Sequence, residues 1–202
     1  YEQDWLVSQY FGSRWLRNEP GHLEQWLSNM HGAAAEAGLP DFMADLSVFR
    51  IALKSPPVAK ALNDLLFTLL QRGSLDARLR ELVIMRIAWV SGSDYEWTQH
   101  YGVAVRAFGC TEEDLAAVRD WQNASHFGAR EKAVLAATDE TLAVGKISEP
   151  TWRQCRQEVG SEEACLDLVA SIGAWTMISQ IARSTELPLE TGASSWAPDG
   201  VA

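Results

Sequence analysis

Apolar residues recur along most of this chain at the spacing of an α-helix. After Ser55-Pro56-Pro57, a pattern typical of a helix start, they return every three or four positions, at Val58, Ala61, Leu62, Leu65, Leu66 and Leu69. No stretch shows a convincing alternation of apolar and polar residues, which a half-buried strand requires. The pattern therefore predicts an all-α fold of about six to eight helices.

Glycine, proline and capping residues mark where the predicted helices begin and end. The expected helices cover residues 24–36, 55–72, 74–91, 93–107, 111–121, 130–144, 148–159 and a long final stretch from 161. We expect an N-terminal helical and aromatic extension (1–54), one helical domain (55–189) and a C-terminal tail (190–202). The tail is expected to be loose, because it is rich in Gly, Ser and Pro.

The stretch from Arg78 to His100 holds the residues whose chemistry stands out. Glu81 lies in a run that is hydrophobic on nearly every side, as in a buried helix. A buried carboxylate is costly unless it is paired, so Glu81 needs a partner or a function. Gly92 ends this helix, and on the next one Glu96 and His100 lie four residues apart on one face. Two acids and an imidazole that converge on an apolar region are suited to proton transfer.

Each of these residues also has a structural interpretation. Ser93 and Glu96 have the spacing of a capping box, in which Glu96 only closes the start of its helix. His100 fits a hydrogen-bonded core histidine, and Glu81 fits an ion pair with Arg78, three residues earlier on the same helix. The isolation of Glu81 among apolar residues and the register of Glu96 with His100 favour the functional interpretation.

Three pieces of the sequence together resemble the carboxymuconolactone decarboxylase family, which includes the alkylhydroperoxidase D-like (AhpD-like) proteins. They are Leu79-Arg80-Glu81-Leu82-Val83-Ile84, Tyr95-Glu96-Trp97 with His100, and Ala107-Phe108-Gly109 followed by Thr111-Glu112-Glu113. The resemblance runs from about residue 55 to 189 and implies the AhpD-like helical fold, which assembles into trimers, hexamers or related rings. In the peroxidase branch a Cys-x-x-Cys pair opens the second helix, where this chain has Ser93 and Glu96. Glu81, Glu96 and His100 carry over, as in the decarboxylase-like branch.

Composition narrows the classes of function. The chain has 202 residues, of which 47% are hydrophobic and 22% charged, an ordinary balance for one globular domain. Its net charge of −10 argues against nucleic acid or an anionic membrane as partner. No apolar run reaches the roughly 18 residues of a transmembrane helix. We expect a cytoplasmic protein, although a leader removed before Tyr1 would leave no trace in this sequence.

The sequence shows no motif for a metal or a cofactor. Cys110, Cys155 and Cys165 have neither disulfide nor metal-site spacing. Glu96 and His100 supply two metal ligands, but no third is visible. No glycine-rich phosphate loop occurs either, so we expect neither a metal nor a cofactor.

We expect a cofactor-independent acid–base enzyme, decarboxylase-like, that acts on a small carboxylated lactone or a related ring acid. His100 would move the proton, Glu96 would orient it, and Glu81 would complete the relay or act as a second acid or base. Arg78 and Trp89, on or at the edge of the face that carries Glu81, are candidates for binding the substrate. Isomerisation or dehydration by the same residues is equally compatible with the sequence.

Two other classes of function remain open at this point. A peroxidase-like antioxidant protein needs a reactive thiol near His100, and Cys110 is poorly placed past the end of the helix. A non-catalytic oligomer that binds a small acid would keep the fold without turnover. In every case we expect a homo-oligomer, a trimer or a hexamer, because the apolar helices are broader than one domain covers. The N-terminal aromatic residues fit packing in the core or at an interface, with a lid over the site as the alternative.

Overall fold

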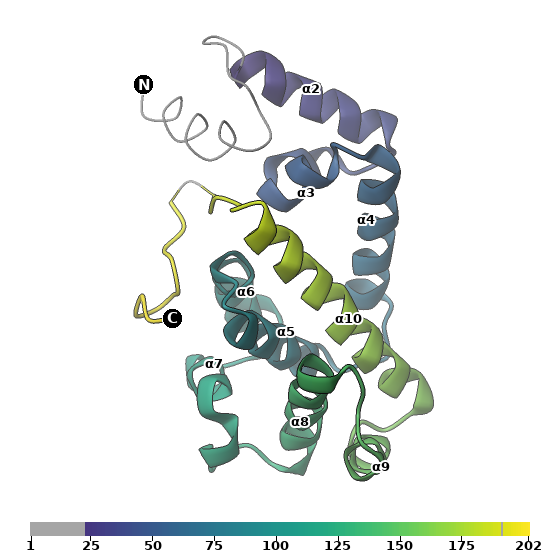
Figure 1. The fold of residues 1–202 in the computed structure, drawn as a ribbon, viewed down its shortest axis with the longest axis vertical. Coiled ribbons are helices and arrows are strands. Elements are labelled where there is room, and N and C mark those ends of the chain that lie inside the picture. The colour runs from purple at the N-terminus through teal and green to yellow at the C-terminus, as the bar shows by residue number, and fades with distance from the viewer. Residues whose placement is uncertain (1–22, 191) are drawn as a thin grey trace. The chain divides into compact units, whose positions relative to one another are not determined.

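The computed structural model describes residues 23–190 and 192–202, with side chains from residue 29 onward, so the N-terminal tryptophans lie outside the described side chains. Along this part of the chain nine α-helices and two short 3-10 helices follow one another, and no strand occurs (Figure 1). The all-α fold is confirmed. The number of helices exceeds six to eight because two of the nine are only six residues long.

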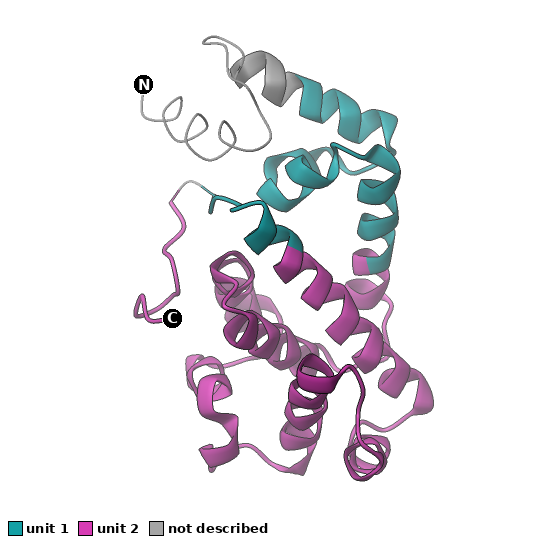
Figure 2. Cartoon of the chain, in the orientation of Figure 1, with its two compact units in different colours: residues 1–65, 181–191 teal, residues 66–180, 192–202 magenta. Residues whose placement is uncertain are grey.

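The elements are α2 Leu23–Glu36, η1 Asp41–Asp45, α3 Ser47–Ala52, α4 Pro56–Gln71, α5 Ala77–Ser91, α6 Asp94–Ala107, α7 Glu112–Ala117, η2 Val118–Asn123, α8 Ala129–Val144, α9 Glu149–Glu158 and α10 Glu162–Ser184. They group into two compact units (Figure 2). The first takes the chain up to residue 65 and residues 181–191, and the second takes residues 66–180 and 192–202. α4 and α10 contribute residues to both units.

The first unit is tied together by polar contacts at its turns. His31 Nδ1 lies 2.8 Å from Asp41 Oδ1, and Arg50 Nε donates to the carbonyl oxygen of Ala44 at 2.7 Å. The backbone N–H of Ser47 donates to Glu190 Oε1 at 2.9 Å, which joins the segment after α10 to the start of α3.

The second unit is built around α5. Ten consecutive residues of this helix, 79 to 88, are buried, because a run without a polar face has no side to present to water. α6 and α8 both pack against α5, and α9 packs against α8. The Asp76 side chain caps the start of α5, a place that the sequence also allowed for Ser74, by accepting from the N–H of Leu79 at 3.1 Å. Gly92 ends it in the left-handed conformation (φ 67°), so the chain turns directly into α6.

α10 supplies a further wall of the same core. Among the described residues it is the one helix long and apolar enough to cross a membrane, with a mean hydropathy of 1.4 and half of its apolar window buried. Its residues Leu168, Ile172 and Trp175 belong to the core that includes α5. Core helices of globular proteins also have this length and composition, and the packing of α10 is of that kind.

Candidate active site

Glu81 and His100 meet inside the second unit. Glu81 projects from α5 and its side chain is fully buried, whereas His100 projects from the second turn of α6 and its side chain is 16% exposed. Nδ1 of His100 lies 2.8 Å from Oε2 of Glu81, within hydrogen-bond distance. An ionised carboxylate only accepts hydrogen bonds, so Nδ1 is the donor in this pair. The bond fixes the imidazole ring and leaves Nε2 as the nitrogen that faces other groups.

Nε2 of His100 faces one acceptor and one donor. Oε2 of Glu96, one helical turn earlier on α6, lies 3.7 Å away. The indole N–H of Trp175 on α10 donates to Nε2 at 3.1 Å, with the two rings nearly perpendicular at 80°. The indole needs a lone pair on Nε2, whereas Glu96 needs a proton there. The two neighbours therefore stabilise opposite protonation states of one atom.

The charges around His100 favour its protonated form. Burial alone would lower the pKa of His100, but the charge of Glu81, the hydrogen bond with it and the charge of Glu96 outweigh burial, so the pKa lies above the ordinary 6.5. Arg80 opposes this rise in the pKa. The guanidinium of Arg80 lies 3.5 Å from Oε1 of Glu81 and 5.0 Å from the centre of the Phe108 ring. Arg80 is therefore the cation that accompanies the buried carboxylate.

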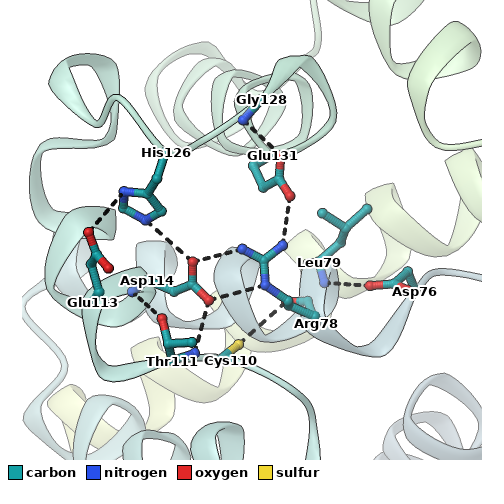
Figure 3. A network of polar contacts seen from close by, with 10 residues as sticks. All are labelled: Asp76, Arg78, Leu79, Cys110, Thr111, Glu113, Asp114, His126, Gly128 and Glu131. Atoms are coloured by element: carbon teal, nitrogen blue, oxygen red, sulfur yellow. Dashed lines mark hydrogen bonds and ion pairs between the residues drawn. The ribbon is translucent and has the colours of Figure 1, made fainter.

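Arg78 belongs to a different polar network (Figure 3). Its guanidinium donates to Asp114 at 2.7 and 3.1 Å and to Glu131 at 2.6 Å. Burial would raise the pKa of each of these carboxyls, but Arg78 holds both pKa values below the ordinary range. The suggested ion pair between Arg78 and Glu81 is therefore wrong. A substrate contact for Arg78 stays a prediction, and the geometry gives this side chain a bridging role between α5, α7 and α8.

Ser93 precedes α6 but does not form the suggested capping box. It occupies the N-cap position, yet its side chain accepts no capping hydrogen bond. Its Oγ is buried and has no hydrogen-bond partner among the described residues. Ser93, Glu96 and His100 follow one another at i, i+3 and i+7, so they share one face of the helix. An unsatisfied buried hydroxyl costs free energy, and a bound molecule on this face would satisfy it.

Trp89, the other predicted substrate contact, lies in an aromatic cluster. Its ring centre is 5.6 Å from that of Trp97 and 5.9 Å from that of Trp196. The guanidinium carbon of Arg119 lies 4.8 Å above the Trp89 ring. The contacts described for Trp89 are with this cluster, and its role toward a substrate stays a prediction.

The three cysteines are poorly suited to thiol chemistry. Cys110, Cys155 and Cys165 are all buried and unpaired. Burial raises the pKa of Cys110 and of Cys155 to about 12 and also raises the pKa of Cys165. A thiol that stays protonated is a weak nucleophile. Within the described residues no group of three His, Cys, Asp or Glu side chains is placed to hold a metal.

Two site residues escaped the sequence analysis. Arg80 carried a signal, because it is a second charge inside the apolar run that holds Glu81. Trp175 carried none, because it is one of many large apolar residues on α10 and only tertiary packing brings its indole N–H to His100.

The fold and these residues define an AhpD-like helical protein. Residues 56–140 match the model of the carboxymuconolactone decarboxylase family, and this segment runs from α4 into α8 and contains Glu81, Glu96 and His100. Through this segment the chain belongs to the carboxymuconolactone decarboxylase and AhpD-like family, as the sequence motifs indicated.

Solved structures share the fold at low sequence identity. A protein of unknown function from Agrobacterium tumefaciens, whose description suggests an antioxidant defence protein AhpD, is 21% identical, with a TM-score of 0.63 over 69% of this chain and 94% of its own. An uncharacterized peroxidase-related protein from Silicibacter sp. TM1040 is 15% identical, with a TM-score of 0.63 over 85% and 87%. The debrominase Bmp8, solved with 2,3,4-tribromopyrrole, is 16% identical, with a TM-score of 0.62 over 86% and 90%. These likenesses show the fold alone. No curated protein matches the chain.

Proposed function

We propose that the chain is a cofactor-independent acid–base enzyme, decarboxylase-like, that acts on a small carboxylated lactone or a related ring acid. The observation that carries the proposal is the position of His100. Its Nδ1 is held by the buried Glu81 at 2.8 Å, and its Nε2 faces both Glu96 and the indole of Trp175. An imidazole that is oriented through one nitrogen is suited to transfer a proton through the other.

The proposed reaction uses the proton on Nε2. The bond between the ring carbon and the carboxylate breaks, carbon dioxide leaves, and the electron pair passes into the neighbouring carbonyl system as an enolate. The Nε2–H of the His100 imidazolium then delivers its proton to carbon, and solvent later restores it. Glu81 stabilises the imidazolium before transfer, and the indole N–H of Trp175 stabilises the lone pair on Nε2 after it. Trp175 is thus a positioning residue that acts through His100.

The charges near His100 bear on the substrate. Glu81 and Glu96 are both buried acids, and the guanidiniums of Arg78 and Arg80 are engaged with protein carboxylates. A substrate carboxylate next to His100 therefore meets negative charge and apolar walls, which favours its departure as neutral carbon dioxide. The binding of a small brominated pyrrole by Bmp8, whose fold is similar, supports a small ring compound as substrate.

A thiol-dependent peroxidase is the weaker candidate. The names of two structural neighbours refer to antioxidant or peroxidase proteins, but that chemistry needs a reactive cysteine. All three cysteines of this chain are buried with raised pKa values, and Ser93 and Glu96 stand where the peroxidase branch has its cysteine pair.

Carbon dioxide release from a panel of carboxylated lactones, carboxymuconolactone included, tests the proposal. The variant is His100→Gln, and the matched control is His31→Gln, because His31 belongs to the first unit and contacts Asp41. We expect release by the wild type and the control and a loss of about 100-fold or more in His100→Gln. Equal release by His100→Gln, or none from folded wild type, contradicts it. Deuterium exchange at ring carbons without carbon dioxide release would instead indicate an isomerase.

We also propose that the chain forms a homo-oligomer, a trimer or a hexamer. One face of α10 exposes large apolar side chains at helical spacing, with Leu166 67%, Val169 39% and Met177 39% exposed. Such a face is typical of an interface. Light scattering on the wild type and on Leu166→Glu checks this: the charge is expected to lower the molar mass, and a monomeric wild type contradicts the proposal.

A further inference from the structure

The C-terminal segment, expected to be loose, makes specific contacts with α6. Trp196 N and Ser195 Oγ donate to the carboxylate of Asp94 at 2.8 and 2.6 Å. Trp97 Nε1 donates to the carbonyl oxygen of Ala197 at 2.6 Å. Thr98 Oγ1 donates to the carbonyl oxygen of Ser194 at 3.3 Å. Several of these bonds go to the backbone of the segment, so they recognise its extended conformation as well as its side chains.

The Trp196 side chain completes an aromatic cluster. Its ring lies 5.9 Å from the ring of Trp89, edge on at 89°, and 5.9 Å from the ring of Trp97. Only 9% of Trp196 is exposed, although it lies seven residues from the end of the printed sequence. Its backbone has φ 49°, a costly conformation for a residue with a side chain, which persists only when surrounding contacts enforce it.

Arg119 binds the acidic end of the segment. Its guanidinium makes two parallel hydrogen bonds with the Asp199 carboxylate, at 2.7 and 2.9 Å. The same guanidinium lies 4.8 and 4.9 Å above the rings of Trp89 and Trp97. Arg119 holds the pKa of Asp199 at about 2. A bidentate arginine stacked on aromatic faces is a geometry that recognises carboxylates.

We propose that Trp89, Asp94, Trp97, Thr98 and Arg119 form a peptide-binding site, here called the tail-docking surface, whose occupant is the chain's own segment 194–199. The site selects an extended segment with an aromatic residue followed three positions later by an acid. Docking also fixes the first turn of α6.

The tail-docking surface is coupled to His100 through the chain itself. Glu96, which faces Nε2 of His100, lies between Asp94 and Trp97, and both of these hold the segment. Release of the segment removes hydrogen bonds on both sides of Glu96. The inference does not rest on the proposed reaction, because it is tested by binding and by hydrogen exchange.

Hydrogen exchange followed by mass spectrometry, on the full chain, tests the inference. Trp196→Ala removes the aromatic anchor, and Asp199→Asn weakens the salt bridge at a position that is 46% exposed. Val201→Ala is the control, because this side chain is 53% exposed. We expect exchange in residues 94–101 to rise by about tenfold in Trp196→Ala and less in Asp199→Asn, and to stay unchanged in the control.

A synthetic peptide of residues 192–202, added to each variant, identifies the site. It is expected to restore slow exchange in Trp196→Ala but not in Trp196→Ala combined with Arg119→Gln. Unchanged exchange in residues 94–101 for both tail variants, or no effect of the peptide on Trp196→Ala, would overturn the inference. If Trp196→Ala does not fold, Asp199→Asn with the peptide decides in the same way.

Discussion

The indole nitrogen of Trp175 lies 3.1 Å from Nε2 of His100. This contact exists only while Nε2 carries a lone pair, so Trp175 stabilises the neutral imidazole. Glu81 and Glu96 act the other way and raise the pKa of His100. Without a group that favours the neutral form, two carboxylates would keep the imidazole protonated and unable to exchange its proton.

Trp175→Phe is expected to raise the pKa of His100 further. Loss of one neutral hydrogen bond is worth about 1 kcal/mol, which corresponds to about 0.7 of a pKa unit. An NMR titration of the His100 ring measures it. Trp121→Phe is the control, because that indole donates to Asp139 at 2.9 Å instead. A fall in the pKa of His100, or the same shift in the control, would count against the assigned role.

Glu81→Gln is expected to affect the pKa of His100, the stability and the turnover together. The pKa of His100 falls because its largest stabilising charge is removed. The free energy of unfolding falls by about 3 kcal/mol, because Arg80 remains buried without its partner. Turnover on an identified substrate falls by about 100-fold or more.

Glu140→Gln is the matched control for that substitution. The Glu140 carboxylate accepts hydrogen bonds from Ser148 and Thr151, so this variant also loses stability. Urea unfolding and the His100 titration together separate the two: only Glu81→Gln should lower the pKa of His100. A normal His100 titration in Glu81→Gln would show that the 2.8 Å contact is not formed in solution.

The pH dependence of stability carries the signature of His100. Its pKa in the folded state lies above the ordinary 6.5, so the imidazolium contributes stability that is fully present below the unfolded pKa. This contribution is lost as the pH rises through the folded pKa. Urea midpoints from pH 5 to 9 should show the wild type's advantage over His100→Gln shrinking toward high pH. An advantage that grows with pH would reverse the sign of the account.

Arg78→Gln tests whether this arginine is structural. Its loss leaves Asp114 and Glu131 without their cation, at a cost of about 2 kcal/mol after allowance for the 29% exposure of Arg78. Both carboxyls have lowered pKa values in the fold, so their contribution is present at neutral pH and is lost as the pH falls through the folded values. The difference between wild type and variant should therefore shrink in acid.

Arg153→Gln serves as the control for Arg78→Gln, because Arg153 and its partner Glu149 are 67% and 73% exposed. Its urea midpoint is expected to stay near the wild-type value. If Arg78→Gln keeps its stability but loses affinity for a substrate carboxylate, the earlier expectation that Arg78 binds substrate is the correct one.

Local signals made most of the fold predictable. Pro56 and Gly92 mark helix ends through backbone conformations that each residue imposes by itself. Thr111 forms a full capping box with Asp114 at the start of α7. The start of α5 was less certain, because Ser74 and Asp76 are both capping residues and the sequence does not rank them.

The candidate site was predictable only in part. The contact between His100 and Glu96 follows from helical spacing, and the family motifs pointed to Glu81. The spacing rule paired Glu81 with Arg78, but Asp114 and Glu131 from other helices bind that guanidinium instead. Trp175 and the docking of Trp196 depend on contacts between residues far apart in the chain, which periodicity and composition do not show.

The most direct test of the account is the titration of His100 itself, by ¹⁵N NMR on the wild-type protein labelled in its histidines, with His100→Gln to assign the signal. We predict a pKa above 6.5 and, in the neutral form, a proton on Nδ1 with Nε2 accepting from Trp175. A pKa at or below 6.5, or a neutral form with its proton on Nε2, would contradict the arrangement of Glu81, Glu96 and Trp175 around His100 on which the proposed proton transfer depends.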